Sequence, residues 1–407
     1  ELISELFPNL FDMSPYGTCK EWLIDKSMLW SFLLSLFLSW QRRMEDVRKI
    51  IIKTLFIIPK LVKKLISKDF KLYLDCKIIL IMSCDKKILI TGESGFIGSH
   101  LINFFVSQYP SYEIHGLDAL TYASNRDYNK RIENFENYFF HKIDICNRED
   151  IIRLFSQHRF TDVIHLAAES HVDNSINNPL LFAQTNIIGT LHLLNAFKEF
   201  SKGRFHHIST DEVYGDLDIG DQPFHEKSSY KPSSPYSASK ASSDHFVRSY
   251  HRTYGLNIVV TNCSNNYGPH QHQEKFIPTI IRSILQNQKI PIYGSGSNIR
   301  DWLYVLDHVQ ALDLIFHKGR TGETYNIGAD NEVSNLELVD FICDICLDKK
   351  IHQDPKKLIT FIPDRLGHDK RYAINYDKLK NELQWSPVYN FHDSLSKTID
   401  WYIDNQK

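Results

Sequence analysis

Three evenly spaced glycines restrict the fold of this chain more than any other feature of its sequence. Gly92, Gly95 and Gly98 lie between an apolar run, residues 87–91, and a helical run, residues 99–109. The first glycine permits a tight turn, the second lets backbone approach a pyrophosphate, and the third lets a helix pack closely on a strand. The helix N-terminus then faces the phosphates with its partial positive charge. The spacing therefore predicts a dinucleotide-binding loop.

Strand-like and helical runs alternate along the chain after Lys86. The strand-like runs are 87–91, 113–118, 138–145, 162–167, 205–210 and 257–264, and further helical runs are 148–158 and 180–200. This alternation predicts an α/β protein with a Rossmann-type doubly wound parallel sheet. We expect an NAD-binding domain with the catalytic residues over 86–264 and a smaller, mainly substrate-binding lobe over 265–407.

An acidic residue follows the glycine loop at the spacing expected for a ribose contact. Asp118 comes twenty residues after Gly98, at the end of the second predicted strand. A carboxylate at this place accepts hydrogen bonds from the ribose hydroxyls of NAD and repels the 2′-phosphate of NADP. The sequence therefore predicts NAD as the cofactor.

The first 85 residues differ from the rest and predict a helical extension of unknown role. Residues 27–41 are free of charge, but this run is shorter than the roughly 20 residues of a membrane span. Residues 41–77 carry eleven Lys or Arg against four Asp or Glu. A basic amphipathic helix within 22–77 on an anionic membrane surface is one interpretation, and a helix packed on its own protein is the other. The chain begins with Glu1, so it is also interpreted as a possible fragment.

Charge and cysteine content narrow the class of protein. The net charge of −2 gives no electrostatic argument for binding nucleic acid. Seven scattered cysteines do not indicate a disulfide framework, so we expect the reducing cytoplasm, with membrane-peripheral binding as the alternative. Cys343 and Cys346 form a C-x-x-C pair within an amphipathic helical run, residues 336–347, and are predicted to be buried thiols. We predict no metal ion.

Two further motifs carry acid–base chemistry. Tyr236 and Lys240 stand four residues apart in a helical run, which places both on one face. We expect the ammonium group to lower the pKa of the phenol, so that Tyr236 acts as a base, and to bind the nicotinamide ribose. Asp211 and Glu212 follow a predicted strand directly. Carboxylates at such a strand end suit an acid and a base working on neighbouring carbons.

Several long segments resemble one family. HLAAESHVD (165–173), RFHHISTDEVYGDL (204–217), PSSPYSASKASSDH (232–245), TNCSNNYGP (261–269), IRDWLYV (299–305), GETYNIG (322–328) and DRLGHDKRYAI (364–374) resemble dTDP-glucose 4,6-dehydratases of the extended short-chain dehydrogenase/reductase superfamily. The resemblance runs from Lys87 to Ile403. The sequence departs from the family pattern at Glu93, which replaces a glycine and puts a charge beside the cofactor loop. It departs also at Leu366, which replaces a proline, and at 270–273.

The resemblance implies a reaction and a role for each motif residue. Tyr236 would take the proton of the sugar 4-hydroxyl while hydride passes from C4 to NAD, and Thr210 would bind the 4-oxygen. Glu212 would remove the C5 proton, and a protonated Asp211 would protonate the departing C6 hydroxyl. Return of hydride to C6 would yield dTDP-4-keto-6-deoxyglucose for deoxysugar biosynthesis of the rhamnose type. A homodimer is expected on the same basis.

The resemblance also implies two groups of binding residues. The implied cofactor residues, beside Gly92, Gly95, Gly98, Tyr236 and Lys240, are Phe96, Ile97, Asp118, Asp144, Ile145, Leu166, Ala167, Ala168, Glu169, Ser170, Thr185 and Asn266. The implied nucleotide-sugar residues are Ser170, Thr210, Asn265, Lys275, Phe276, Pro291, Tyr293, Arg300, Asn335, Asp364, Arg365 and His368. Arg300 and Arg365 suit a diphosphate, because guanidinium groups match phosphate oxygens.

Three alternatives stay open. One is a UDP- or CDP-sugar 4,6-dehydratase. Another is a nucleotide-sugar 4-epimerase, which needs Tyr236 and NAD but no acid–base pair at 211 and 212. The third, of a different class, is a non-catalytic NAD or nucleotide-sugar sensor on the same fold. A sensor would not need Thr210, Asp211, Glu212, Tyr236 and Lys240 together, so the intact set favours a dehydratase.

Overall fold

The computed structural model describes residues 86–405. The predictions of an N-terminal helical extension over 1–85 and of membrane contact through 22–77 lie outside the described residues. Everything below concerns the described part.

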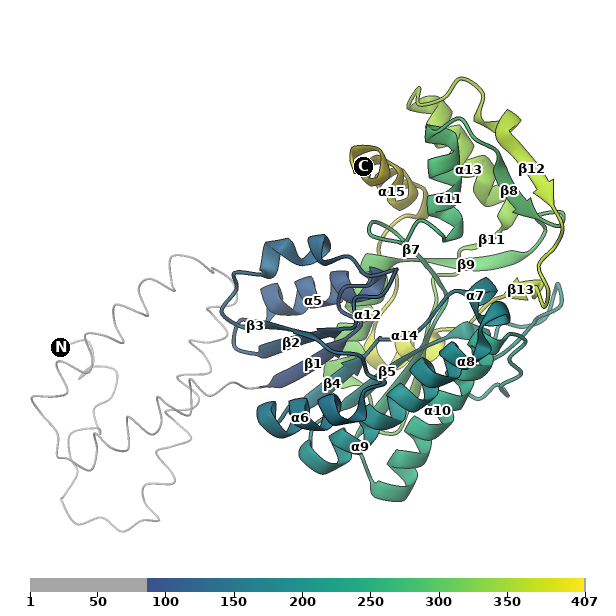
Figure 1. The fold of residues 1–407 in the computed structure, drawn as a ribbon. Helices are drawn as coiled ribbons and strands as arrows, with labels where there is room; N and C mark the ends of the chain where they lie inside the picture. Colours follow the sequence, from purple (N-terminus) through teal and green to yellow (C-terminus); the bar gives the residue numbers. More distant parts are fainter. Residues whose placement is uncertain (1–85, 406–407) are drawn as a thin grey trace, which may run out of the picture. The chain divides into compact units, whose positions relative to one another are not determined.

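A parallel sheet of seven strands forms the centre of the fold (Figure 1). Its strands are β1 (Lys87–Thr91), β2 (Glu113–Asp118), β3 (Tyr138–Lys142), β4 (Asp162–His165), β5 (Phe205–Thr210), β6 (Ile258–Cys263) and β10 (Thr324–Ile327). Their order is β10-β6-β5-β4-β1-β2-β3, and every pair is parallel. The predicted Rossmann-type fold is confirmed. The order reverses between β1 and β4, which is where such sheets bind ligands.

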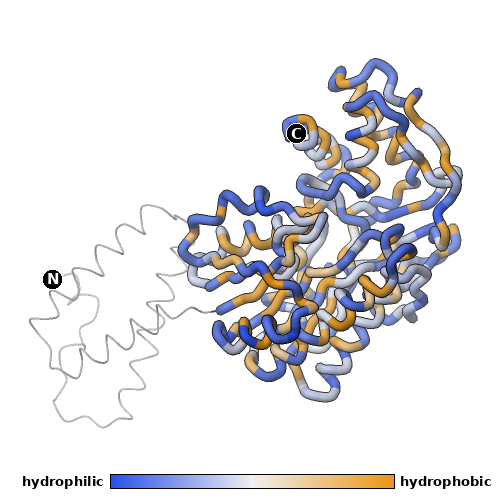
Figure 2. The backbone as a smooth tube through the Cα atoms, in the orientation of Figure 1, coloured by the Kyte–Doolittle hydropathy of each residue, from blue (hydrophilic) through white to orange (hydrophobic). Residues whose placement is uncertain are grey.

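Helices cover both faces of this sheet. One face carries α5 (Phe96–Gln108) and α12 (Val305–Lys318), and the other carries α6 (Arg148–His158), α9 (Thr190–Phe200) and α10 (Pro235–Tyr254) (Figure 1). Side chains of β1 alternate between the two cores, with Ile88 and Ile90 in one and Leu89 in the other. The middle of β1 is accordingly apolar on both sides. In Figure 2 the orange, hydrophobic stretches of the chain are seen in the interior of the fold.

The sheet also recruits chain from the segment predicted as the second lobe. β10 pairs with β6 from Thr324 to Ile327, far beyond residue 264, and α12 packs beside α5. Predicted element ends also shift. β3 and β4 end at Lys142 and His165, before the predicted 145 and 167, and α5 begins at Phe96 because Gly95 is its N-cap.

The second lobe has its own small sheets and core. β7 (Asn265–Tyr267), β9 (Ile299–Tyr304), β11 (Glu332–Ser334) and β13 (Arg371–Tyr372) form one sheet, and β8 (Ile290–Tyr293) with β12 (Ile359–Ile362) forms another. Helices α11 (Phe276–Leu285), α13 (Asn335–Asp348) and α15 (Phe391–Asp404) pack around a separate apolar cluster. Cys343 and Cys346 are buried in α13, as predicted.

Shorter elements complete the described chain. They are η1 (Arg126–Ile132), α7 (Val172–Asn177), α8 (Pro179–Phe182), η2 (Ala183–Gly189), η3 (Asp211–Val213), η4 (Pro355–Leu358) and α14 (Asp377–Leu383). Among the described residues one continuous helical run, 179–200, is long and apolar enough to cross a membrane by length and composition. Its Leu193, Leu194 and Phe197 lie in the core under the sheet, so this run is a core helix of the fold.

Candidate active site

A cleft of about 380 Å³ opens at the carboxyl ends of the central strands. All the predicted cofactor and catalytic residues line it. They are Gly92, Gly95, Phe96, Ile97, Gly98, Asp118, Asp144, Ile145, Leu166, Ala167, Ala168, Glu169, Ser170, Thr185, Thr210, Asp211, Glu212, Tyr236, Lys240 and Asn266. The fold therefore brings together residues that are up to 174 positions apart in the chain (from Gly92 to Asn266).

The glycine loop has the geometry that its spacing predicts. Gly92 has a φ of +73°, and a Cβ on it would lie 2.8 Å from the backbone nitrogen of Ala167. A Cβ on Gly98 would lie 1.9 Å from the carbonyl oxygen of Gly92, so any side chain there would push the helix off the strand. The backbone thus leaves room at the start of α5 for the pyrophosphate of a dinucleotide.

Asp118 ends β2 beside this loop. One carboxylate oxygen accepts a hydrogen bond from the backbone N–H of Ser94 at 3.0 Å, and the other accepts from Leu120 N–H at 2.8 Å and Ser124 Oγ at 2.7 Å. These bonds fix the carboxylate at the lip of the cleft. Oδ1 already accepts two hydrogen bonds, whereas Oδ2 accepts one and can accept a further bond from a ribose hydroxyl of NAD.

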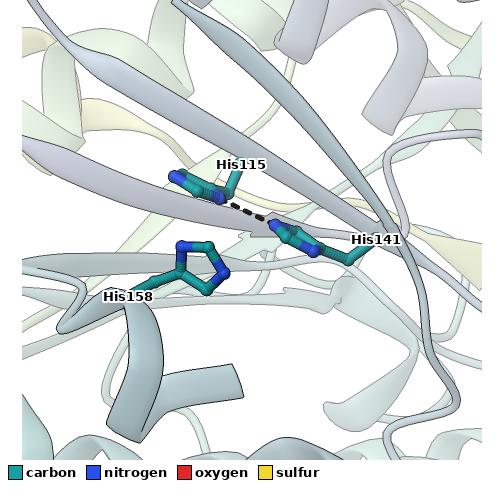
Figure 3. A group of neighbouring side chains, drawn as sticks. All are labelled: His115, His141 and His158. Carbon is teal, nitrogen blue, oxygen red and sulfur yellow. Dashed lines mark hydrogen bonds between the residues drawn. The ribbon is translucent and has the colours of Figure 1, made fainter.

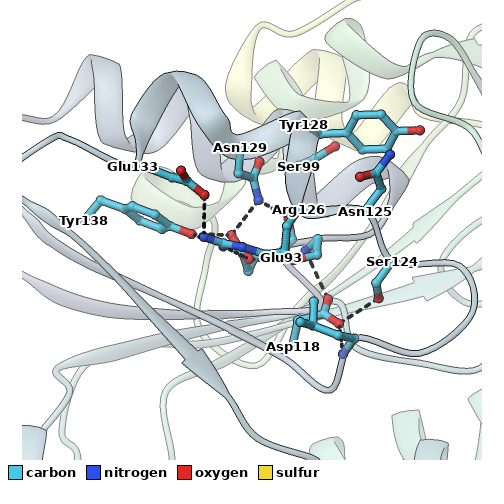
Figure 4. A network of polar contacts seen from close by, with 12 residues as sticks. Glu93, Ser99, Asp118, Ser124, Asn125, Arg126, Tyr128, Asn129, Glu133 and Tyr138 are labelled. Atoms are coloured by element: carbon cyan, nitrogen blue, oxygen red, sulfur yellow. Dashed lines mark hydrogen bonds and ion pairs between the residues drawn. The ribbon is translucent and has the colours of Figure 1, made fainter. Parts of the chain in front are cut away.

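The carboxylate of Glu93 does not face the cofactor loop, contrary to our expectation. It is fully buried on the other side of the loop and does not line the cleft (Figure 4). Its oxygens accept hydrogen bonds from Ser94 Oγ at 2.6 Å, Arg126 Nη1 at 2.8 Å, Asn129 Nδ2 at 2.7 Å and Tyr138 Oη at 2.9 Å. The charge is therefore paired inside the protein and is turned away from the phosphates.

Gly116 makes room for this buried glutamate. A Cβ on Gly116, in the middle of β2, would lie 2.7 Å from Cγ of Glu93. The two positions are thus matched across the loop and the strand: a large residue at 93 requires the smallest residue at 116.

The start of α10 places the tyrosine and the lysine. Ser234 caps the helix in a capping box with Ser237, and Pro235 occupies its first turn. Tyr236 and Lys240 consequently lie on one helical face, and both are nearly buried in the cleft wall.

The predicted pKa effect of Lys240 on Tyr236 is absent from this arrangement. The ammonium group donates a hydrogen bond to the carbonyl oxygen of Ile208 at 2.8 Å. Burial, followed by the neighbouring charge of Glu212, raises the pKa of Tyr236 well above its ordinary value. The prediction used the i, i+4 spacing of the two side chains and left out the desolvation of the buried phenol, which has the opposite effect on its pKa.

The adjacent carboxylates at the end of β5 have different surroundings. Asp211 is 2 % exposed, and its Oδ2 has no hydrogen-bond partner. Burial, then the charges of Glu212 and Asp301, raises its pKa well above the ordinary range. Burial also raises the pKa of Glu212, but Arg365, Lys275 and Arg300 act in the opposite direction. The pair thus combines a carboxyl that favours its neutral form with one that faces three cations.

The implied nucleotide-sugar residues divide into two groups. Ser170, Thr210, Asn265 and Lys275 line the cleft, and Lys275 Nζ donates to the carbonyl oxygen of Ser170 at 2.8 Å. The others lie in the second lobe and do not line that cleft: Phe276, Pro291, Tyr293, Arg300, Asn335, Asp364, Arg365 and His368.

Two side chains from this second group nevertheless converge on Asp173, beyond the cleft. Tyr293 Oη and the Arg365 guanidinium both approach Asp173, at 3.3 Å and 3.8 Å. Arg300 is 5 % exposed and donates to the carbonyl oxygen of Asp369 at 2.9 Å. Of the two arginines predicted to bind a diphosphate, Arg365 is thus held by a weak ion pair, whereas Arg300 already has backbone partners.

Sequence reasoning missed several residues that line the cleft. They are Leu117, Ala119, Thr121, Ala123, Ser124, Ile143, Leu181, Ile208, Ser209, Cys263, Ser264, Gln271, His272 and Glu274. Ile208, Ser209, Cys263 and Ser264 directly adjoin predicted strand ends, so the rule about carboxyl ends could have included them. Ala119 directly follows a predicted strand end as well, whereas residues 121–124 carried no such signal.

Together, the parallel sheet, the glycine loop with Asp118, and the Tyr-x-x-x-Lys helix define an NAD-dependent enzyme of the short-chain dehydrogenase/reductase class. The sequence profile of the GDP-mannose 4,6 dehydratase family matches residues 89–398. The chain belongs to this family and, within it, to the dTDP-glucose 4,6-dehydratases.

Individual relatives agree with this assignment. The chain is 47% identical over 340 residues to dTDP-glucose 4,6-dehydratase 1 of Escherichia coli K12. The aligned region covers 79% of this chain and 94% of that protein. It is also 47% identical to the dTDP-glucose 4,6-dehydratase of Haemophilus influenzae, over 78% of this chain and 98% of that one.

Solved structures show the same architecture. The dTDP-glucose 4,6-dehydratase of Streptomyces venezuelae, crystallised with NAD, superposes with a TM-score of 0.73 at 40% identity, over 78% of this chain and 97% of that one. A UDP-glucose 4-epimerase of Thermotoga maritima superposes with a TM-score of 0.72 at 29% identity, over 79% of this chain and 100% of that one. The fold alone therefore does not separate dehydratase from epimerase, and residues of the site have to do so.

Proposed function

We propose that the cleft converts dTDP-glucose to dTDP-4-keto-6-deoxyglucose, with NAD reduced and reoxidised within one cycle, for deoxysugar biosynthesis. The observation that carries this proposal is the Asp211–Glu212 pair in the same cleft as Tyr236 and the glycine loop. Epimerisation at C4 needs no acid and base for a neighbouring carbon, whereas loss of water across C5 and C6 needs both.

Bound NAD would accept a hydride from C4 of the sugar and return one to C6. Tyr236 would receive the proton of the 4-hydroxyl, and Thr210 would hold the 4-oxygen from the end of β5. The raised pKa of Tyr236 in this arrangement means that the phenol needs an added positive charge before it can act as a base. The oxidised nicotinamide carries such a charge, and we expect the phenol to ionise only with it in place.

Elimination would follow from the asymmetry of the two carboxyl groups. The 4-ketone acidifies the C5 proton, which Glu212 would remove while Lys275 and Arg365 face its charge. Asp211, whose pKa burial raises, would protonate the departing 6-hydroxyl as water.

Three variants test this division of labour. Asp211→Asn removes the acid and Glu212→Gln removes the base, so each should lower product formation by about 10²–10⁴-fold, the usual contribution of one general acid or base. Both should still reduce bound NAD when dTDP-glucose is added, seen as nicotinamide absorbance. Tyr236→Phe should block that absorbance change, because it removes the base for the first step.

The contradicting outcomes are equally specific. A folded, NAD-bound Asp211→Asn enzyme that forms product at the wild-type rate would exclude Asp211 as the acid. Failure of that variant to reduce NAD would move Asp211 into the oxidation step. Formation of dTDP-galactose by the unmodified chain would replace the proposal with a 4-epimerase.

The nucleotide preference is tested by comparing turnover of different sugar nucleotides. We propose thymidine diphosphate because the relatives at 47% identity are dTDP-glucose enzymes. Residues 270–273 depart from the family pattern near the cleft, which keeps UDP and CDP as the alternatives to test. Turnover of dTDP-glucose should exceed turnover of UDP- and CDP-glucose at equal concentration. A preference for UDP-glucose would refute this part alone and leave the dehydratase chemistry in place.

We also propose a cytoplasmic homodimer. The four described cysteines are free thiols, as a reducing compartment keeps them. Two neighbouring helices each carry an exposed apolar side chain, Leu180 on α8 at 80 % exposed and Phe246 on α10 at 39 % exposed. Light scattering should give a mass of two chains for the wild type, and Phe246→Asp should lower that mass to a single chain. A monomeric wild type would refute the dimer.

A further inference from the structure

Three histidines meet on a face of the sheet outside the candidate active site. His115 lies in β2, His141 in β3 and His158 at the last residue of α6 (Figure 3). One ring nitrogen from each lies within 4.8 Å of the others, and none of the three residues lines the cleft. Two neighbouring strands and the helix above them thus direct three imidazoles to one point.

A carboxylate orients the central ring. His115 is 1 % exposed, and its Nε2 lies 2.7 Å from Oε1 of Glu113. Its Nδ1 lies 2.7 Å from Nε2 of His141. Because Nε2–H donates to the carboxylate, Nδ1 of a neutral His115 carries the lone pair that points into the cluster. Lys87 Nζ contacts the same Glu113 oxygen at 2.7 Å and holds the carboxylate in place.

The Nδ1 lone pair of His115 accepts a hydrogen bond from His141 Nε2–H. A carboxylate behind a histidine is also the arrangement that supports metal-bound histidines in proteins, where it fixes the tautomer and raises ligand basicity. The contact of Glu113 with His115 is an observation separate from the convergence of the three histidines.

We propose that His115, His141 and His158 form a binding site for a divalent transition metal ion of the zinc class. Imidazole nitrogen suits Zn²⁺, Cu²⁺ and Ni²⁺, and three protein ligands leave a fourth position for water. With Zn–N distances of about 2.0–2.1 Å, tetrahedral ligand nitrogens lie about 3.4 Å apart. The three nitrogens lie within 4.8 Å of one another. Binding requires the hydrogen bond between His115 and His141 to open and His141 to present an unprotonated ring nitrogen.

The position of the three histidines determines how an ion reaches them and what its binding does to the fold. His141 and His158 are partly exposed, so an ion can enter from solvent past α6. A bound ion would join β2, β3 and α6, the edge of the sheet that is farthest from β10. Binding to the folded state alone raises stability in proportion to the logarithm of ion concentration above the dissociation constant.

The test uses the untagged full-length chain, stripped of metal with a chelator. Residues 1–85 contain no histidine, so no imidazole outside the described residues competes from that end. Isothermal titration with Zn²⁺ should show saturable binding of one ion per chain and a rise in melting temperature. Cu²⁺ in the same site should give an electron paramagnetic resonance spectrum with three nitrogen ligands.

Variants separate this site from incidental binding by surface histidines. His158→Gln, at a partly exposed position that tolerates change, should remove most of the affinity. Glu113→Gln leaves all three ligands and should weaken binding by about 10–100-fold, the usual effect of losing an outer-shell partner. His392→Gln, at an exposed position on α15, is the matched control and should change nothing. Turnover of metal-free His158→Gln protein should equal that of the metal-free wild type.

Two results would overturn the assignment. One is the absence of saturable Zn²⁺ binding by the intact chain, which would leave the three rings as packing residues. The other is an affinity that His158→Gln leaves unchanged, or that His392→Gln lowers equally, which would place the bound ion elsewhere.

Discussion

The pairing of Glu93 with Gly116 gives a quantitative prediction about stability. Glu93→Ala deletes the acceptor of four hydrogen bonds (Figure 4). Asn129 is 0 % exposed and Tyr138 is 7 % exposed, so each loses one acceptor out of reach of water, at about 1–3 kcal/mol per group. Asn129 Nδ2 keeps its hydrogen bond to the backbone carbonyl oxygen of residue 93. The Arg126 side chain is 25% exposed and regains water, so we discount its ion pair. The expected loss of unfolding free energy from these two groups is about 2–6 kcal/mol.

A double-mutant cycle isolates the packing between the two positions. Gly116→Ala would place its Cβ 2.7 Å from Cγ of Glu93, and overpacking of this kind costs about 1–3 kcal/mol. Its φ is not in the left-handed region, so no backbone strain adds to that cost. In the Glu93→Ala background the clashing atoms are absent, and the same Gly116→Ala change should be nearly neutral.

Urea unfolding of the four proteins measures the cycle, with hydrogen exchange at β2 as the local readout. Contacting residues typically show interaction energies of about 0.5–3 kcal/mol. Strict additivity of the two changes would refute the packing argument. A Glu93→Ala protein as stable as the wild type would refute the view that the network stabilises the loop. Gly203→Ala, at a glycine remote from Glu93, is the control and should add independently of Glu93→Ala.

Three further predictions concern the cleft and the extension. Asp211 must be protonated to act as the acid, and burial raises its pKa. Elimination should therefore proceed below that raised pKa and decline as pH rises through it, and Asp211→Asn should lose this alkaline decline. An unchanged pH profile in the variant would contradict the role of Asp211. Denaturing the purified protein should release NAD, and recovery of mainly NADP would contradict the reading of Asp118. A chain that begins near Ser83 should keep its turnover, and a folded but inactive truncation would show that residues 1–82 contribute to catalysis.

The sequence by itself predicted what depends on local patterns. The glycine spacing, the acid twenty residues later and the strand–helix alternation indicated the fold and the cofactor, because each reflects a turn, a strand end or a helix start that neighbouring residues determine. The Tyr236–Lys240 spacing and the tandem carboxylates likewise indicated the residues at the cleft. Family resemblance then supplied the reaction and the second-lobe residues, which no periodicity indicates.

Only the tertiary structure decided matters that depend on distant segments. β10 completes the sheet from beyond residue 320, because strand pairing ignores distance along the chain. Desolvation raises the pKa of Tyr236, since burial depends on everything packed around the ring. Glu93 turns away from the cofactor because Asn129 and Tyr138 offer donors that its own segment lacks. His115, His141 and His158 likewise converge only because β2, β3 and α6 pack together, which sequence spacing of 26 and 17 residues does not reveal.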